Sequence, residues 1–202
     1  MRSLTDQEGQ KLQQIVRRGG TSTVRFRVAG VMALASVLLV ACTGEKSAPV
    51  RGDALYGGLQ SQGVVGSDQA EVGQDWWFAL PVPVNKSSKE IEITEVSLVD
   101  VPRGIKVVEY GAFSRDDTEG LALLVLEGEP HMPDLDRLEN HIEEPVVVPP
   151  RQESDIYYLA HLKITAPPDQ AVRYCKFQYV QGGKQYAQTL DCEVDLRTKK
   201  SV

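Results

Sequence analysis

The chain has 202 residues, 25% of them charged, and its formal net charge is −6 at pH 7. Six of its 22 basic and two of its 28 acidic residues precede residue 42, so residues 42–202 carry a net charge of −10. This acidic balance argues against nucleic-acid binding, which requires Lys and Arg to neutralise phosphates. It also argues against a basic face lying on anionic lipid.

Residues 1–41 have the pattern of an export signal. Arg25 and Arg27 precede fourteen uncharged residues, 28–41. A positive segment, an apolar run of this length and a small residue before a cut are typical of a signal peptide. The run is shorter than the about 20 apolar residues that a membrane-spanning helix needs. Translation from Val24 would leave a compact positive segment; the alternative is an extended one that begins at Met1.

The end of this run, Leu39-Val40-Ala41-Cys42, resembles the lipobox of bacterial lipoproteins. The resemblance implies cleavage before Cys42, a diacylglyceryl group on its sulfur and a mature protein bound to membrane lipid. Two or more acyl chains on one cysteine are enough for stable anchoring. We therefore expect a lipid-anchored protein at the extracytoplasmic face of the cell membrane. The alternative is an ordinary cysteine beside a buried apolar segment.

The segment after Cys42 is expected to be a linker. Residues 43–73 are rich in Gly, Ser, Gln and Ala and show no sustained periodicity, which is typical of a flexible tether. Short apolar spots at Leu55-Tyr56 and Val64-Val65 leave open an additional first strand. The predicted organisation is a signal peptide over residues 1–41, a lipidated cysteine and linker over 42–73, a folded domain over 74–197, and a tail over 198–202.

The remaining sequence predicts strands and turns. Trp76, Phe78 and Leu80 alternate with other residues at the period of a half-buried strand, and the prolines that follow favour an edge position. The apolar run over 121–126 predicts a central strand. A change of parity within 91–98 predicts a β-bulge near Thr94-Glu95. Further strands are expected over residues 105–110, 145–148, 156–164, 172–180 and 185–196.

Strands at about ten-residue spacing predict an all-β, antiparallel β-sandwich of about 7–8 strands. A Pro-Val segment that ends at Asn85 and a Tyr-x-x-Gly-Gly-x-x-Tyr hairpin, Tyr179 to Tyr186, resemble the immunoglobulin-like ectodomains of uncharacterised actinobacterial lipoproteins. The resemblance implies an immunoglobulin-like fold. That group has no defined catalytic motif, so the resemblance implies no activity.

Cys175 and Cys192 are predicted to form a disulfide, because an even pair of cysteines in an exported domain is typical of one. Both fall on one face of the last predicted hairpin. Pairing Cys175 with Cys192 also pairs Phe177 with Leu190 and leaves a four-residue loop over 182–185. Such a register is compatible with a Gly-containing hairpin.

Candidate ligand-binding chemistry is concentrated in residues 127–144, which hold His131, His141 and seven acidic residues. Imidazole and carboxylate groups together suit a borderline divalent metal ion. No fixed ligand spacing is present, so a solvated acidic loop is the alternative. His161 is expected on the outward face of its strand, as a surface residue.

Trp77 lies on the face opposite Trp76, where an exposed ring would make a platform for a ligand or an interface. The alternative is that a loop or the tether covers it. No Gly-x-Ser-x-Gly elbow is present. The sequence therefore predicts a non-enzymatic lipoprotein without a cofactor that binds an unidentified envelope protein or ligand. A metal-binding lipoprotein that uses His131 and His141 is the alternative, and a small secreted hydrolase is the third.

Overall fold

A computed structural model of the chain describes residues 48–118, 123–130 and 132–198. Within these ranges the chain is an all-β sandwich, as the alternating pattern predicted, with twelve strands instead of the expected 7–8. Two short 3-10 helices, η1 (Gly58–Gln62) and η2 (Leu135–Arg137), interrupt the strands. The immunoglobulin-like assignment stays a prediction.

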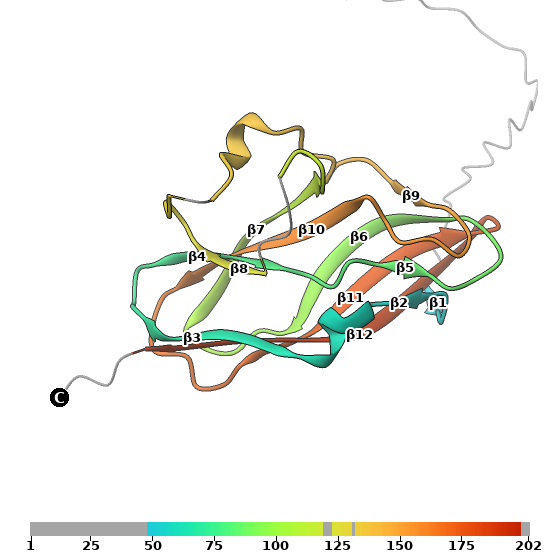
Figure 1. The fold of residues 1–202 in the computed structure, drawn as a ribbon. Coiled ribbons are helices and arrows are strands. Elements are labelled where there is room, and N and C mark those ends of the chain that lie inside the picture. Colours follow the sequence, from blue (N-terminus) through green and yellow to red (C-terminus); the bar gives the residue numbers. More distant parts are fainter. Residues whose placement is uncertain (1–47, 119–122, 131, 199–202) are drawn as a thin grey trace, which may run out of the picture. The chain divides into compact units, whose positions relative to one another are not determined.

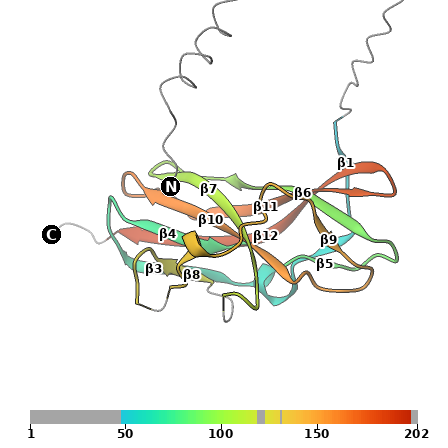
Figure 2. The same ribbon diagram turned by 90° about the horizontal axis from the view of Figure 1, so that it is seen from above.

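One layer is a six-stranded sheet in the order β1-β12-β11-β6-β9, with β3 also paired to β12. The other is a four-stranded sheet in the order β7-β10-β4-β8, and β2 and β5 form a separate pair (Figures 1 and 2). The bounds of the first layer are β1 (Val50–Arg51), β3 (Val64–Ala70), β6 (Ile91–Asp100), β9 (Val146–Val148), β11 (Val172–Gln181) and β12 (Lys184–Thr198). Those of the other strands are β2 (Leu55–Tyr56), β4 (Asp75–Ala79), β5 (Val84–Asn85), β7 (Ile105–Ser114), β8 (Leu124–Leu126) and β10 (Ile156–Ile164).

The main core lies between the two layers and is built from alternate residues of each strand. Trp76, Phe78 and Leu80 belong to it, and so do Tyr158 and Leu162 of β10. Since successive side chains of a strand point to opposite faces, the intervening residues face away from this core. The outward face of the four-stranded sheet is thereby left to carry a second set of side chains.

The predicted bulge in β6 is confirmed. Glu95 is opposite Gln178 and Ile93 is opposite Tyr179, so Thr94 is an extra residue in its strand. The extra residue restores the parity, and Ile91, Ile93, Val96 and Leu98 are all buried.

The expected positions of two strands are exchanged. β4 ends at Ala79, before the prolines, and pairs with both β10 and β8, so it is an inner strand. The run that was expected in the centre of a sheet contains β8, which is the edge strand. The prolines mark the end of β4, because a residue without an N–H cannot continue a ladder on both sides.

The linker predicted over 42–73 is wrong for its described part. β1 and β3 pair in parallel with β12, which is the last strand. The Ala54 N–H donates to the Tyr179 hydroxyl at 3.1 Å, while Leu55 and Ala70 are fully buried. The alternative of an additional strand is confirmed, since Leu55-Tyr56 forms β2 and Val64-Val65 begins β3. Strand pairing uses backbone groups, which Gly and Ser supply as well as any other residue, so a linker-like composition is compatible with these strands.

The disulfide between Cys175 and Cys192 is confirmed, with a Cα–Cα distance of 5.9 Å. The predicted hairpin register is wrong by two residues, since Cys175 is opposite Leu190 and the turn consists of Gly182 and Gly183. Both glycines have positive φ, of 57° and 77°, as a type I′ turn requires. A bulge in β12, where Asp191 and Cys192 lie opposite the single residue Tyr174 (φ 64°), shifts the register and allows the two cysteines to meet.

Candidate functional site

The candidate site lies on the outward face of the four-stranded sheet. The segment 127–144 carries η2 and passes over this face, on the side away from the six-stranded sheet (Figure 1). Met132, Leu135 and Leu138 of this segment pack against the cluster formed by Trp77, Phe113 and neighbouring residues. The described part of the segment is therefore a cover with a solvated acidic exterior, and not simply a solvated loop.

Trp77 is covered, so the expected exposed platform is wrong and the alternative of a covering loop is confirmed. The residue is 8% exposed and stacks on the His161 ring, with 4.5 Å between ring centroids and 14° between planes. This stacking fixes the plane of the imidazole. His161 is itself only 9% exposed, which overturns its interpretation as a surface residue.

Strand register brings four charged side chains around His161. In the ladder of β10 with β4, Lys163 is opposite Asp75 and His161 is opposite Trp77. In the ladder of β10 with β7, His161 is opposite Glu109. Glu127 follows β8 and donates its backbone N–H to the Asp75 carbonyl at 2.9 Å. Directly opposite and diagonal residues on one face are near enough for their side chains to interact.

Two carboxylates converge on the same ring nitrogen. His161 Nε2 lies 3.2 Å from Asp75 Oδ1 and 3.3 Å from Glu127 Oε2. Asp75, Glu127 and His161 each offer one ligand atom, and these atoms lie within 4.8 Å of one another. Nε2 is buried yet makes no hydrogen bond to either oxygen. Nε2 therefore faces two carboxylate oxygens and forms no hydrogen bond with either of them.

The outer contacts of the cluster orient its groups. His161 Nδ1 lies 3.3 Å from Glu109 Oε1, and Lys163 Nζ donates to Asp75 Oδ2 at 2.8 Å. An ionised carboxylate only accepts hydrogen bonds, so we assign the Nδ1 proton to the bond with Glu109. The Lys163 ammonium occupies one oxygen of Asp75 and leaves the other directed at His161. Such an arrangement can hold a divalent cation at Nε2.

A pocket of about 280 Å³ adjoins the cluster. Trp77 and Glu127 line it, together with Met132 and Leu135 of the covering segment. The Trp77 indole N–H is buried without a hydrogen-bond partner. The pocket thus shares one carboxylate and one ring with the histidine cluster.

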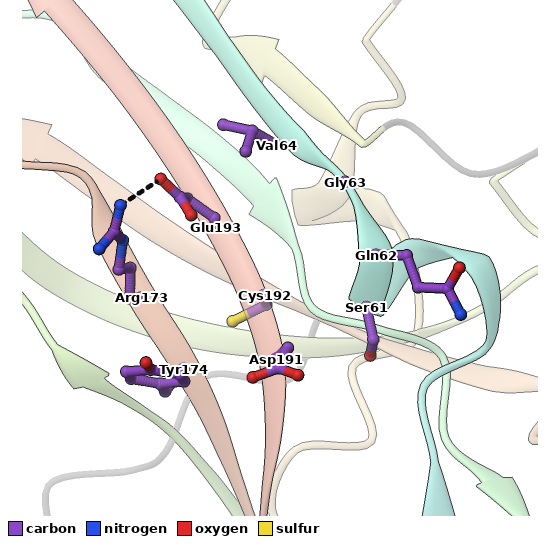
Figure 3. A pocket seen from close by; sticks show the side chains of 9 residues that line it. All are labelled: Ser61, Gln62, Gly63, Val64, Arg173, Tyr174, Asp191, Cys192 and Glu193. Carbon is purple, nitrogen blue, oxygen red and sulfur yellow. Dashed lines mark hydrogen bonds and ion pairs between the residues drawn. The ribbon is translucent and has the colours of Figure 1, made fainter.

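A second pocket, of about 370 Å³, lies between η1 and the bulge of β12 opposite Tyr174 (Figure 3). Arg173 and Glu193 line it and are ion-paired across the two strands at 2.9 Å, as the dashed line in Figure 3 shows. Because these two charges neutralise each other, this pocket is a weaker candidate for a ligand-binding site than the histidine cluster.

The other predicted site residues do not join the cluster. Cys42 and His131 lie outside the described residues. His141 is half-buried, donates its backbone N–H to the Ala112 carbonyl at 2.8 Å and lines a separate pocket with Glu144. In the part of the chain that the structure describes, no helix is long and apolar enough to cross a membrane.

Sequence reasoning missed Asp75, Glu109, His161 and Lys163 as members of one site. A signal was present, since His161 and Lys163 share a parity on one strand, as do Asp75 and Trp77 on another. Only the pairing of β4 with β10 shows that these side chains lie on one face of the same sheet. Comparison with known proteins adds no assignment: no protein-family model matches this chain, and no curated protein matches it.

Proposed function

We propose that the protein is a lipoprotein anchored through Cys42, whose sandwich binds a ligand or an envelope component at the extracytoplasmic face of the membrane without catalysing a reaction. The observation that carries the proposal is the sequence Leu39-Val40-Ala41-Cys42 at the end of an uncharged run. Lipid on Cys42 would keep the domain at the membrane surface.

The disulfide supports an extracytoplasmic location independently of the lipobox. Disulfides persist in oxidising compartments and are rare where glutathione and thioredoxin keep thiols reduced. The bond between Cys175 and Cys192 joins adjacent strands in the sandwich and is buried, with both cysteines at most 5% exposed. A buried bridge of this kind is typical of a structural role, which an exported domain can maintain.

The experiment is mass spectrometry of the N-terminal peptide from the membrane fraction of cells that express the full chain. We expect a mature terminus at Cys42 that carries diacylglycerol. Cys42→Ser should remain unprocessed or leave the membrane, because serine offers no sulfur for the thioether. Thr43→Ser is the matched control and should be processed like the parent. An unmodified terminus at another residue would overturn the anchoring proposal.

The binding role has a separate readout. The unanchored domain should retain its fold and its ligand, because the anchor only sets where the domain acts. Cells that carry Cys42→Ser should therefore show the same envelope defect as cells from which the chain is deleted, while an otherwise matched chain with a different lipoprotein signal should remove that defect. Restoration by a secreted, unanchored chain would contradict a role that depends on the membrane surface.

A further inference from the structure

We propose that Asp75, Glu127 and His161 bind one divalent transition-metal ion, with Zn²⁺ the best fit to the donor set. The site is distinct from the pair His131 and His141 that the sequence indicated. The proposal does not rest on the lipid anchor, and the two can fail independently.

Two of the three separations between the ligand atoms match those around a tetrahedral ion. Zinc binds imidazole nitrogen and carboxylate oxygen at about 2.0–2.2 Å in tetrahedral geometry, which places neighbouring ligand atoms roughly 3.3–3.5 Å apart. The two nitrogen-to-oxygen distances at His161 are 3.2 and 3.3 Å. Both distances to Nε2 are therefore close to the separation that a shared ion imposes, and the two oxygens lie within 4.8 Å of each other.

The unsatisfied nitrogen points to an ion rather than to hydrogen bonds within the cluster. With the Nδ1 proton directed at Glu109, a neutral His161 presents the Nε2 lone pair to two carboxylate oxygens. That contact is repulsive. Nε2 makes no hydrogen bond to either oxygen, although both lie within 3.3 Å of it. A cation bound to all three atoms satisfies each of them at once.

The residues around the three ligands make the supporting contacts that are typical of a metal site. A metal-bound histidine commonly donates its other N–H to a carboxylate, which fixes the ring and raises its basicity. Glu109 is in that position, and Lys163 holds the free oxygen of Asp75. Trp77 restrains the ring by stacking. Two carboxylates balance a double positive charge, and a mixed nitrogen and oxygen set suits Zn²⁺ or Mn²⁺.

Three protein ligands leave one tetrahedral position for water or a ligand group. Glu127 joins the cluster to the adjoining pocket, because its side chain is half-exposed and lines that pocket. An ion at this point would tie the start of the covering segment to β4 and β10. The geometry thus assigns the ion a binding role beside the pocket that Glu127 lines.

The test is isothermal titration of Zn²⁺ into the full chain that carries Cys42→Ser, without a histidine tag and in detergent. Cys42→Ser removes a free thiol that would itself bind zinc. We expect one Zn²⁺ per chain and a rise in Tm of several degrees. Glu127→Gln and His161→Gln should each lower the affinity by at least about tenfold, and Glu109→Gln by roughly 10–100-fold as an outer partner.

Matched controls separate this site from nonspecific binding. Glu129→Gln alters a neighbouring exposed carboxylate, and His141→Gln alters the other described histidine; both should bind Zn²⁺ like the parent. Should His161→Gln fail to fold, Glu127→Gln still decides, because the Glu127 side chain is half-exposed. Absence of saturable binding of Zn²⁺, Mn²⁺ and Co²⁺ to the folded parent would mean that the cluster holds only protons. That result, or affinity lost in His141→Gln and kept in Glu127→Gln, overturns the proposal.

Discussion

Asn85 shows how one buried polar residue connects separate segments of the sandwich. Its side-chain amide donates to the Val148 carbonyl at 3.0 Å and to that of Lys89 at 2.8 Å. Its carbonyl oxygen accepts from the backbone and hydroxyl of Ser87. The residue is completely buried, and its amide is a donor to the buried strand residue Val148. The Lys89 carbonyl also accepts from the Ser87 hydroxyl at 2.8 Å.

Replacing this residue should be costly. Asn85→Ala removes the side-chain donor to the buried Val148 carbonyl and the acceptor of the Ser87 N–H, and each buried group left unsatisfied costs about 1–3 kcal/mol. We expect the free energy of unfolding to fall by at least about 2 kcal/mol in urea denaturation. Lys86→Ala, at the exposed neighbouring position, is the control and should change it little. Equal losses in the two variants would contradict the assigned role of Asn85.

At the scale of elements, β3 depends on the absence of a side chain at Gly66. A Cβ at this position would lie 2.2 Å from the Asp195 carbonyl oxygen of β12. Gly63, at the end of η1, has open space around the same point. The two glycines therefore offer a matched pair for testing whether residues 64–70 are a strand of the domain.

Gly66→Ala should separate β3 from β12, because the backbone oxygen cannot move without breaking the ladder. We expect a loss of about 1–3 kcal/mol in unfolding free energy, the usual range for an overpacked position. Hydrogen exchange should become faster over residues 64–70. Gly63→Ala should leave both measurements unchanged. Unaltered exchange in Gly66→Ala would show that this pairing contributes nothing.

The hairpin of β11 and β12 offers a second test at this scale. The disulfide closes a loop with a sequence separation of 17 residues. A loop of this size is worth about 3 kcal/mol in the chain-entropy account. The double change Cys175→Ala and Cys192→Ala should lower unfolding free energy by that order, measured against the parent with and without reductant. If reductant did not change the unfolding free energy of the parent, under denaturing conditions that expose the bond, the stabilising role of the disulfide would be contradicted.

Elements with strict alternation were predictable, and the residues show why. β10 was identified from Ile156 to Ile164 because its inward face is uniformly apolar. The full extent of β3, of which only Val64-Val65 gave a signal, and the His161 site escaped prediction for different reasons. β3 is held by backbone pairing, and its composition resembles a linker. The site combines side chains from β4, β7 and β10 with the residue after β8, and no spacing along the chain records that they share one face.

At the scale of the molecule, the N-terminal segments belong to the fold. A chain that begins at residue 74, where the sequence placed the domain boundary, lacks β1, β2 and β3. It also lacks the buried residues Ala54, Leu55 and Ala70. We expect it to unfold at a clearly lower urea concentration than a chain that begins at residue 48, as followed by tryptophan fluorescence. Equal midpoints would show that these segments are dispensable.

The position of β1 also limits how far the sandwich can lie from Cys42. Seven residues separate Cys42 from Val50, where the sandwich begins. Even fully extended at about 3.3–3.6 Å per residue, this stretch spans less than about 30 Å. With lipid on Cys42 as proposed, the domain would stay in a thin layer next to the bilayer and would not reach deeper into the envelope. Its partner would then have to come to the membrane, and two membrane-bound partners confined to such a layer meet at a raised effective concentration.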